Sequence, residues 1–325
     1  MNMKQNEVSA GFGKSIPLVY FPFTVLFVDD DTELLKVYNE SLGSKYNVRT
    51  VSSAPEGLSI INDQALPKFN ILTDIANPAD ARLVEDTHEF SKISVAFDKL
   101  LALANNQEKY TKVGIAVVDY QMPDMNGIQL CDAITNQTAK KVLLTGEYDL
   151  SRAVTALNNK QIDCFIRKGE KDTMKDLAFF IAGLKDKYFE DLTKCISTTV
   201  IMDKWKFLKD PQYIEFFNDI IAKYNICEYY FIDNNGNFLL INDKSEKLVL
   251  VRYDNESLDE FCNFFGGESK ISELINAVNK RELIPYFGIN TDPMSVDLSN
   301  WDKCFYKANK YNDFYWNVVK LDNTN

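Results

Sequence analysis

The stretch VLFVDDD, residues 25–31, is an apolar run that ends in three consecutive aspartates, and it decides the fold predicted for this chain. Short apolar runs of this kind are typical of strands that are buried on both faces of a parallel sheet. In an open α/β sheet the carboxyl ends of the strands line one crevice, where ligands bind. We therefore expect a parallel sheet whose first strand delivers carboxylates to that crevice.

Three later apolar runs also end in a polar residue, namely Asp119, Thr145 and Lys168. Strands that end at the same edge of a sheet would bring carboxylates, a hydroxyl and an ammonium group together. Carboxylate oxygens suit Mg²⁺, which usually takes one or two carboxylates, several waters and a phosphoryl oxygen. The pattern predicts a Mg²⁺-dependent phosphate site in which Lys168 balances the remaining negative charge.

Together these runs resemble a known family, the receiver domain of two-component response regulators. The motifs are VLFVDDD, VVDYQMPDMNG, VLLTG and CFIRKG, and the last three fall in order at separations that the family normally shows. The resemblance covers roughly residues 22–190, with one interruption. It implies an α/β fold, a doubly wound, flavodoxin-like receiver with a five-stranded parallel sheet.

The resemblance also implies the chemistry of the site. Asp119 would accept a phosphoryl group from a partner histidine kinase or phosphotransfer protein. Asp29 and Asp30 would hold Mg²⁺ together with Asp119 and the backbone carbonyl of Gln121. The activity implied for the chain is this phosphotransfer and the subsequent autodephosphorylation, with no further enzymatic activity expected.

Thr145 and Lys168 would contact the phosphoryl oxygens, and Phe165 would be a switch residue that turns inward when Thr145 shifts. A carboxylate can accept a phosphoryl group, and the transfer depends on positioning and charge neutralisation more than on acid–base catalysis. Each motif alone also has a structural interpretation, because aspartates after a strand often cap a helix. Their joint order and spacing favour the functional interpretation.

The length of the chain, its motifs and the spacing of its apolar residues predict four parts. These are an N-terminal extension (1–22), the receiver (23–172, with an insertion at about 64–110), a connecting helix (173–200) and a smaller α+β output domain (201–325). The insertion contains a helix with an apolar face, made by Phe90, Ile93, Phe97, Leu100 and Leu101. That face must be covered by something, either the receiver itself or a partner surface, and the sequence does not decide between them.

The connecting helix carries Leu177, Ile181, Leu184 and Tyr188 at a coiled-coil-like spacing. An exposed apolar stripe commonly finds a partner, and a symmetric dimer is the commonest solution. We therefore expect a homodimer through this helix or the neighbouring receiver face, strengthened by phosphorylation. The rival interpretation buries the same stripe inside one chain, between receiver and output domain.

In the output domain we expect a helix followed by a mostly antiparallel sheet. Residues 229–232 and 238–241 flank an Asn/Gly-rich turn, as in a β-hairpin. Further strands are expected at 247–253, 304–307 and 315–320, and helices at 213–221, 258–265 and 271–279. The hairpin pattern is loosely similar to PAS-type sensor folds.

Composition narrows the classes of function. The net charge is −11, and residues 201–325 hold 14 Lys and Arg against 20 Asp and Glu, a balance of −6. This disfavours nucleic acid as a partner, because DNA-binding domains usually carry a basic face. The leading hypothesis is an output domain that binds a protein or small ligand; a DNA-binding output and a phosphorylation-controlled enzyme are the alternatives.

The cysteines and the single histidine argue against a zinc site and against a histidine relay within this chain. The six cysteines are scattered without a CxxC pair, so we expect free thiols in the cytoplasm rather than a zinc site. His88 is the only histidine, which makes a histidine relay within this chain improbable. No apolar stretch approaches the roughly 20 residues of a membrane helix, so we expect no membrane span.

Overall fold

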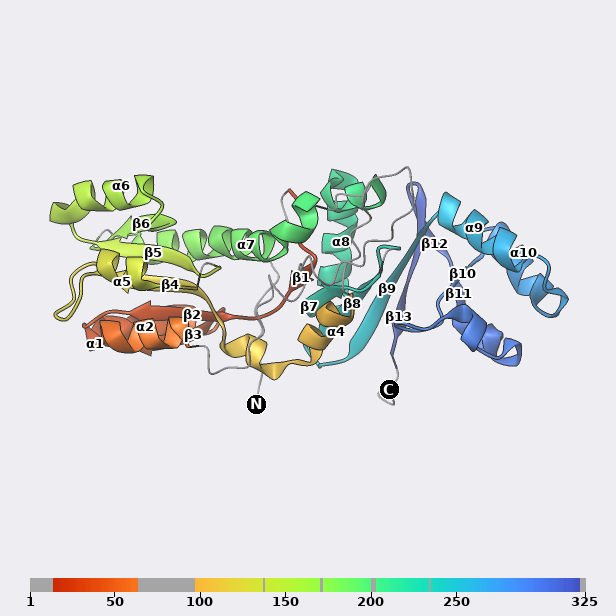
Figure 1. Ribbon diagram of the computed structural model, residues 1–325, viewed down its shortest axis with the longest axis horizontal. Helices are drawn as coiled ribbons and strands as arrows, with labels where there is room; N and C mark the ends of the chain where they lie inside the picture. The colour runs from red at the N-terminus through yellow and green to blue at the C-terminus, as the bar shows by residue number, and fades with distance from the viewer. Residues whose placement is uncertain are drawn as a thin grey trace, which may run out of the picture.

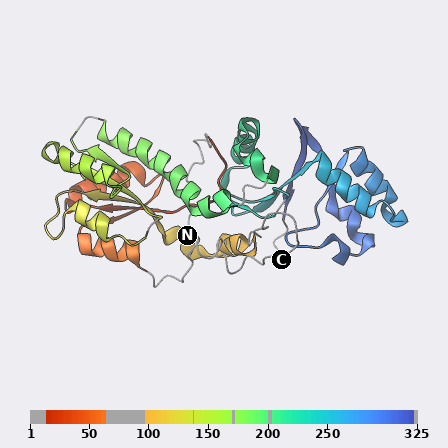
Figure 2. The same ribbon diagram turned by 45° about the horizontal axis from the view of Figure 1, so that its top comes forward.

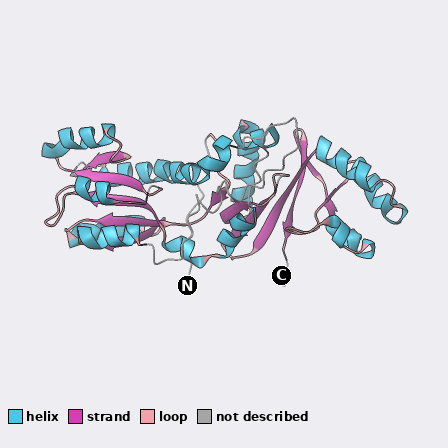
Figure 3. Cartoon of the chain, viewed as in Figure 1, coloured by secondary structure: helices cyan, strands magenta, loops and turns pink. Residues whose placement is uncertain are grey.

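The computed structural model describes residues 14–63, 97–136, 138–169, 172–199, 203–233 and 235–321 of the chain. Figure 1 shows two sheets at different places along an elongated molecule, with one long helix running between them. Figure 3 separates the parallel sheet on one side from the antiparallel strands on the other. Within the described ranges, no helix combines the length and the apolar character that a membrane crossing requires.

The predicted five-stranded parallel sheet is confirmed, with strand order β3-β2-β4-β5-β6. Its strands are β2 (Thr24–Val28), β3 (Asn47–Val51), β4 (Val113–Asp119), β5 (Lys140–Thr145) and β6 (Cys164–Arg167). Every residue of β2 and β4 is buried. Helices cover both faces of the sheet, which explains why its inner strands are continuous apolar runs.

The helices of this part divide between the two faces, as in a doubly wound fold. One face packs against α1 (Thr32–Leu42) and α7 (Thr173–Thr199). The other packs against α2 (Ala54–Asn62), α5 (Gly127–Ala133) and α6 (Leu150–Asn158). The short 3₁₀ turns η1 (Gln107–Thr111) and η2 (Glu147–Asp149) precede β4 and α6. The expected flavodoxin-like receiver fold is therefore confirmed.

The antiparallel sheet has six strands in the order β1-β7-β8-β9-β13-β12. They are β1 (Val19–Tyr20), β7 (Ile226–Phe231), β8 (Phe238–Asn242), β9 (Lys247–Asp254), β12 (Asn309–Tyr311) and β13 (Phe314–Lys320). The predicted hairpin is β7 with β8, and the pairing is antiparallel throughout. A second, mostly antiparallel sheet is thus confirmed, while the PAS-type comparison stays a prediction.

The remaining elements surround this sheet. They are η3 (Asp203–Lys209), α8 (Pro211–Lys223), α9 (Asn255–Phe265), η4 (Ser269–Ile271), α10 (Ser272–Asn279), β10 (Leu283–Pro285), η5 (Pro293–Ser295), η6 (Leu298–Cys304) and β11 (Phe305–Lys307). β10 and β11 pair with each other as a separate two-stranded ribbon. Both Figure 1 and Figure 2 place α9 and α10 at the end of the molecule remote from the receiver.

Two segments outside residues 201–325 contribute to the antiparallel sheet and its packing. β1, from the N-terminal extension, pairs with β7 through Val19 opposite Tyr230 and Tyr20 opposite Tyr229. The insertion helix α4 (Phe97–Asn105) packs on the same sheet. The ring of Phe97 lies 5.9 Å from that of Phe231. The two alternatives suggested by the sequence were the receiver and a partner surface, and the structure shows instead that the C-terminal sheet of the same chain packs on this helix. Phe90 and Ile93 lie outside the described residues.

The apolar stripe of α7 is covered within the one chain. Leu177 and Ile181 are fully buried, and Leu184 and Tyr188 are 8% and 2% exposed. Farther along, Phe189 lies 4.8 Å from the ring of Tyr20 on β1. The expectation of an exposed stripe is therefore wrong, because the receiver sheet and β1 already bury it. One apolar core runs without interruption from the receiver into the antiparallel sheet.

Candidate functional site

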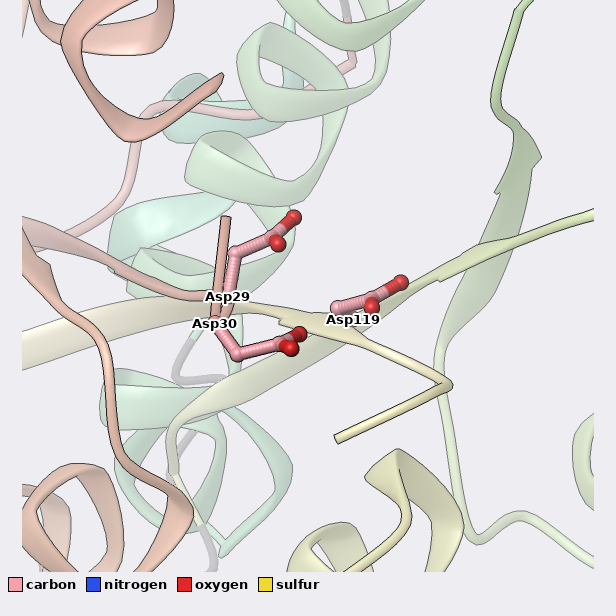
Figure 4. Close-up of side chains that lie close together, drawn as sticks. All are labelled: Asp29, Asp30 and Asp119. Atoms are coloured by element: carbon pink, nitrogen blue, oxygen red, sulfur yellow. The ribbon is translucent and has the colours of Figure 1, made fainter. Parts of the chain in front are cut away.

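The predicted carboxylates meet at the carboxyl ends of β2 and β4. Oxygen atoms of Asp29, Asp30 and Asp119 all lie within 4.8 Å of one another, and Figure 4 shows the three side chains gathered at one place. Asp29 and Asp119 are buried, whereas Asp30 is exposed. The group is open to solvent on one side, so a small ligand can reach it.

Lys168 joins this group from the end of β6. Its Nζ lies 2.8 Å from Asp29 Oδ2 and 2.7 Å from Asp119 Oδ1. Its backbone N–H donates to the carbonyl of Thr145 at 2.8 Å, which fixes the end of β6 beside that of β5. Gly169 follows with φ of +83°, a left-handed conformation that glycine adopts without strain. Burial alone would lower the pKa of Lys168, but hydrogen bonds with both carboxylates outweigh it and raise the pKa overall.

The donor set fits a divalent cation. Three carboxylates and one ammonium leave a formal charge of −2 when all are ionised (three minus one). Burial raises the pKa of Asp119, and the contact with Lys168 offsets only part of that effect. Clustered carboxylate oxygens are the ligands that Mg²⁺ prefers, so the chemistry and charge of these residues match the expected ion.

The loop after Asp119 ends in Asn126 and Gly127, the last two residues of the motif VVDYQMPDMNG. Asn126 caps α5 by accepting from the N–H of Gln129 at 3.0 Å, and the Gln129 side chain accepts in return from the N–H of Asn126. A Cβ at Gly127 would lie 2.3 Å from the carbonyl oxygen of Asp119. Only glycine therefore lets α5 start this close to the end of β4.

Thr145 and Phe165 lie on the neighbouring strands. Thr145 is fully buried, and its hydroxyl donates to the carbonyl of Gly146 at 3.2 Å. Phe165 is partly buried and packs against the core on the side of α2, α5 and α6. Thr145 thus ends the strand next to β4, where Leu144 pairs with Asp119, whereas Phe165 pairs with Leu143 two residues before the end of β6.

Gln121 follows in the loop after Asp119, and its side chain reaches across to the start of α6. Its Nε2 donates to Asp149 Oδ2 at 2.9 Å. Next to this bond, Arg152 Nη1 donates to the hydroxyl of Tyr120 at 2.7 Å. Sequence reasoning missed Asp149 and Arg152, because no motif marks them and only the folded loops bring them together.

The comparisons with known proteins agree with this architecture. Neither a protein-family model nor a curated protein matches the sequence. Among solved structures, the response regulator LqsR of Legionella pneumophila matches 94% of this chain and 90% of its own, with 24% identity and a TM-score of 0.73. At this identity the match establishes the fold: the chain has the architecture of a receiver-domain response regulator along nearly its whole length.

Solved structures of receiver domain proteins match a shorter part of this chain. Those of Clostridium thermocellum and Methanospirillum hungatei cover 51% and 52% of this chain and 95% and 98% of their own, with 18% and 23% identity. Their TM-scores are 0.32 and 0.34, so these two matches add nothing to the assignment of the fold.

Proposed function

We propose that this chain is a response regulator of a two-component phosphorelay, in which Asp119 accepts a phosphoryl group from a histidine kinase or phosphotransfer protein. The observation that carries the proposal is the meeting of Asp29, Asp30, Asp119 and Lys168 at the ends of three strands. In such a transfer, a carboxylate oxygen of Asp119 forms a bond to phosphorus while the bond from phosphorus to the donor nitrogen breaks.

The neighbouring groups would support this transfer by neutralising charge. Mg²⁺, held by Asp29, Asp30, Asp119 and the backbone carbonyl of Gln121, would shield the phosphoryl oxygens when bound. The ammonium of Lys168, already 2.7 Å from Asp119, would contact one of these oxygens. The pairing of Lys168 with the free carboxylates keeps it in place before phosphorylation.

Thr145 and Phe165 would convert phosphorylation into a conformational change. The hydroxyl of Thr145 now donates to Gly146, and a phosphoryl group on Asp119 would offer it a stronger, anionic acceptor. Its movement would vacate space for the ring of Phe165. Contacts that differ between two states in this way shift a pre-existing equilibrium, and the face made by α6, β6 and α7 would change.

The C-terminal part would act as the output of this switch. Its net negative charge, −6 over residues 201–325, favours a protein or small-molecule ligand over nucleic acid. The protein would work in the cytoplasm and form a homodimer that phosphorylation strengthens. With the stripe of α7 buried, the receiver face of α6, β6 and α7 is the surface left for that dimer.

A direct test uses the full chain, acetyl phosphate as donor and intact-mass measurement. With Mg²⁺ present we expect the mass to rise by one phosphoryl group, and with EDTA in place of Mg²⁺ we expect no change. A wild-type chain that gains no phosphoryl group under either condition would contradict the proposed function.

A further inference from the structure

The loop that follows Asp119 has few main-chain restraints of its own. Its ends are fixed, because the N–H of Tyr120 donates to the carbonyl of Leu144 and the N–H of Gly127 donates to the carbonyl of Tyr120. Between them, within the described part of the chain, residues 121–125 make no backbone–backbone hydrogen bond. Something else must hold the carbonyl of Gln121 if this carbonyl is to serve a metal ion.

The side chain of Gln121 is held by Asp149, which makes this contact in place of a more usual role. It immediately precedes α6, where an aspartate commonly accepts a hydrogen bond from the first turn of the helix. Here its side chain makes no such capping bond. Its Oδ2 instead accepts from Gln121 Nε2 at 2.9 Å, and its Oδ1 lies 3.6 Å from Arg152 Nη1. The residue is only 8% exposed, so the carboxylate is committed to this contact.

We propose that Asp149 is a positioning residue for the phosphate site, which holds Gln121 and thereby orders the loop whose carbonyl would face the metal ion. The inference rests on the proposed function, because it concerns the same metal site. The hydrogen bond from Gln121 Nε2 to Asp149 Oδ2 restrains the side chain of Gln121. It fixes the end of the Gln121 side chain before the metal ion arrives, so that less ordering of the backbone is needed on binding.

The receiver contains a matched control for this contact. Gln161 Nε2 donates to both oxygens of Asp132, at 2.9 and 2.7 Å. This bond joins α5 to the segment before β6 and touches none of the site residues named above. Asp132→Ala therefore removes the same kind of Gln–Asp bond from the same domain without disturbing the loop.

The probe is Mn²⁺, which prefers the same oxygen ligands as Mg²⁺, titrated into the full chain with free Mn²⁺ followed by electron paramagnetic resonance. We expect Asp149→Ala to weaken binding about five- to tenfold, which corresponds to roughly 1–1.4 kcal/mol. Asp132→Ala should bind like the wild type. Equal affinity of Asp149→Ala and wild type would overturn the inference, whereas a wild type that binds no Mn²⁺ would instead contradict the metal site of the proposed function.

Two further variants separate positioning from simple attraction between Asp149 and the cation. Asp149→Asn keeps an oxygen that can accept from Gln121 but loses the charge, so we expect it to stay within about twofold of the wild type. Gln121→Ala keeps the backbone carbonyl and should match Asp149→Ala, with no added loss in the double variant. Additive losses would show that Asp149 and Gln121 act independently of each other. An Asp149→Asn variant as weak as Asp149→Ala would show that the charge of Asp149 acts alone. Either result would overturn the inference.

Discussion

The two ends of the receiver sheet carry opposite arrangements of charge. At the carboxyl end, three carboxylates share a single ammonium group, so negative charge is left over. At the amino end, charged side chains lie in one-to-one pairs that reach α7 or the C-terminal sheet. These pairs are Lys109 with Glu228, Lys140 with Asp191, and Lys187 with Asp163. The difference teaches that one end has the excess negative charge that the proposed cation site requires, whereas the ion pairs at the other end join two parts of the molecule.

The pair of Lys109 and Glu228 is the most buried of these contacts. Both side chains are 1% exposed, with Lys109 Nζ 3.2 Å from Glu228 Oε2. The hydroxyl of Tyr230 donates to Glu228 at 2.7 Å, and that of Tyr110 donates to its other oxygen. The carbonyl of Tyr110 also accepts from Asn47 Nδ2 at 3.1 Å. The starts of β3 and β4 are therefore tied to β7 through one satisfied network.

The largest effect is expected at the carboxyl end, from Asp30→Ala. Removing this carboxylate lowers the formal charge of the group from −2 to −1, because two carboxylates and the Lys168 ammonium remain, so Mn²⁺ binding to the full chain should fall below detection in the same resonance assay. Asp31→Asn is the matched control, because Asp31 is the adjacent aspartate and caps α1. If Asp30→Ala bound Mn²⁺ as tightly as the wild type, the carboxyl end of the sheet would not be the metal site that we propose.

The next effect is expected at the amino end, from Glu228→Ala. Breaking a buried ion pair by removing one partner leaves an uncompensated charge, here the ammonium of Lys109, and costs about 3–5 kcal/mol of the free energy of unfolding. Urea denaturation of the full chain measures this loss. Glu33→Ala removes an exposed pair with Lys36 and should leave stability nearly unchanged. A similarly small loss of unfolding free energy in Glu228→Ala would mean that this network does not hold the receiver and the C-terminal sheet together.

A smaller effect is expected from Thr145→Ala, which tests the conformational change proposed for the carboxyl end of the sheet. Phosphorylation should persist, since Thr145 supplies no ligand to the acceptor, but the change in the β6–α7 face should weaken. Hydrogen exchange with and without beryllofluoride measures this change, and Thr145→Ser, which keeps the hydroxyl, is the control. If Thr145→Ala changes its exchange as the wild type does, this switch is not used.

The smallest effect concerns assembly through the receiver face. Val154 on α6 and Phe179 on α7 are 44% and 74% exposed, and Tyr148 on η2, just before α6, is 96% exposed. Exposed apolar side chains of this kind can bury one another in a dimer. Light scattering at several concentrations should show a monomer–dimer equilibrium that beryllofluoride shifts toward the dimer, by severalfold in the dissociation constant. Phe179→Lys should weaken it. A monomeric mass at every concentration, with and without beryllofluoride, would show that the protein does not form this dimer.

The receiver site was predictable because its pattern is local. Each apolar run ends in the polar residue that reaches the crevice, and strand order then brings Asp29, Asp119 and Lys168 together. The motif that follows Asp119 also contains Asn126 and Gly127, but their roles in capping and in close approach are apparent only from the folded loop. Local patterns therefore determine both this half of the fold and the composition of its candidate site.

The contacts between the receiver and the antiparallel sheet were not predictable, because the residues that make them are distant in sequence. β1 has only two residues and pairs with β7, about two hundred residues later, and no local pattern encodes such a partner. The spacing of Leu177 and Tyr188 showed that α7 has an apolar face, but not what covers it. In the same way, the bond of Gln121 to Asp149 exists only once two loops have folded against each other.

The most direct test of the central claim compares Asp119, the last residue of β4, with Asp124 in the loop that follows it. The full chain, Asp119→Asn and Asp124→Asn are each incubated with acetyl phosphate and Mg²⁺, and their intact masses are measured. Asp124 is exposed in the loop after β4, so its variant controls for a lost carboxylate near the site. We predict one added phosphoryl group on the wild type and on Asp124→Asn, and none on Asp119→Asn. A phosphoryl adduct that persists in Asp119→Asn would contradict the account.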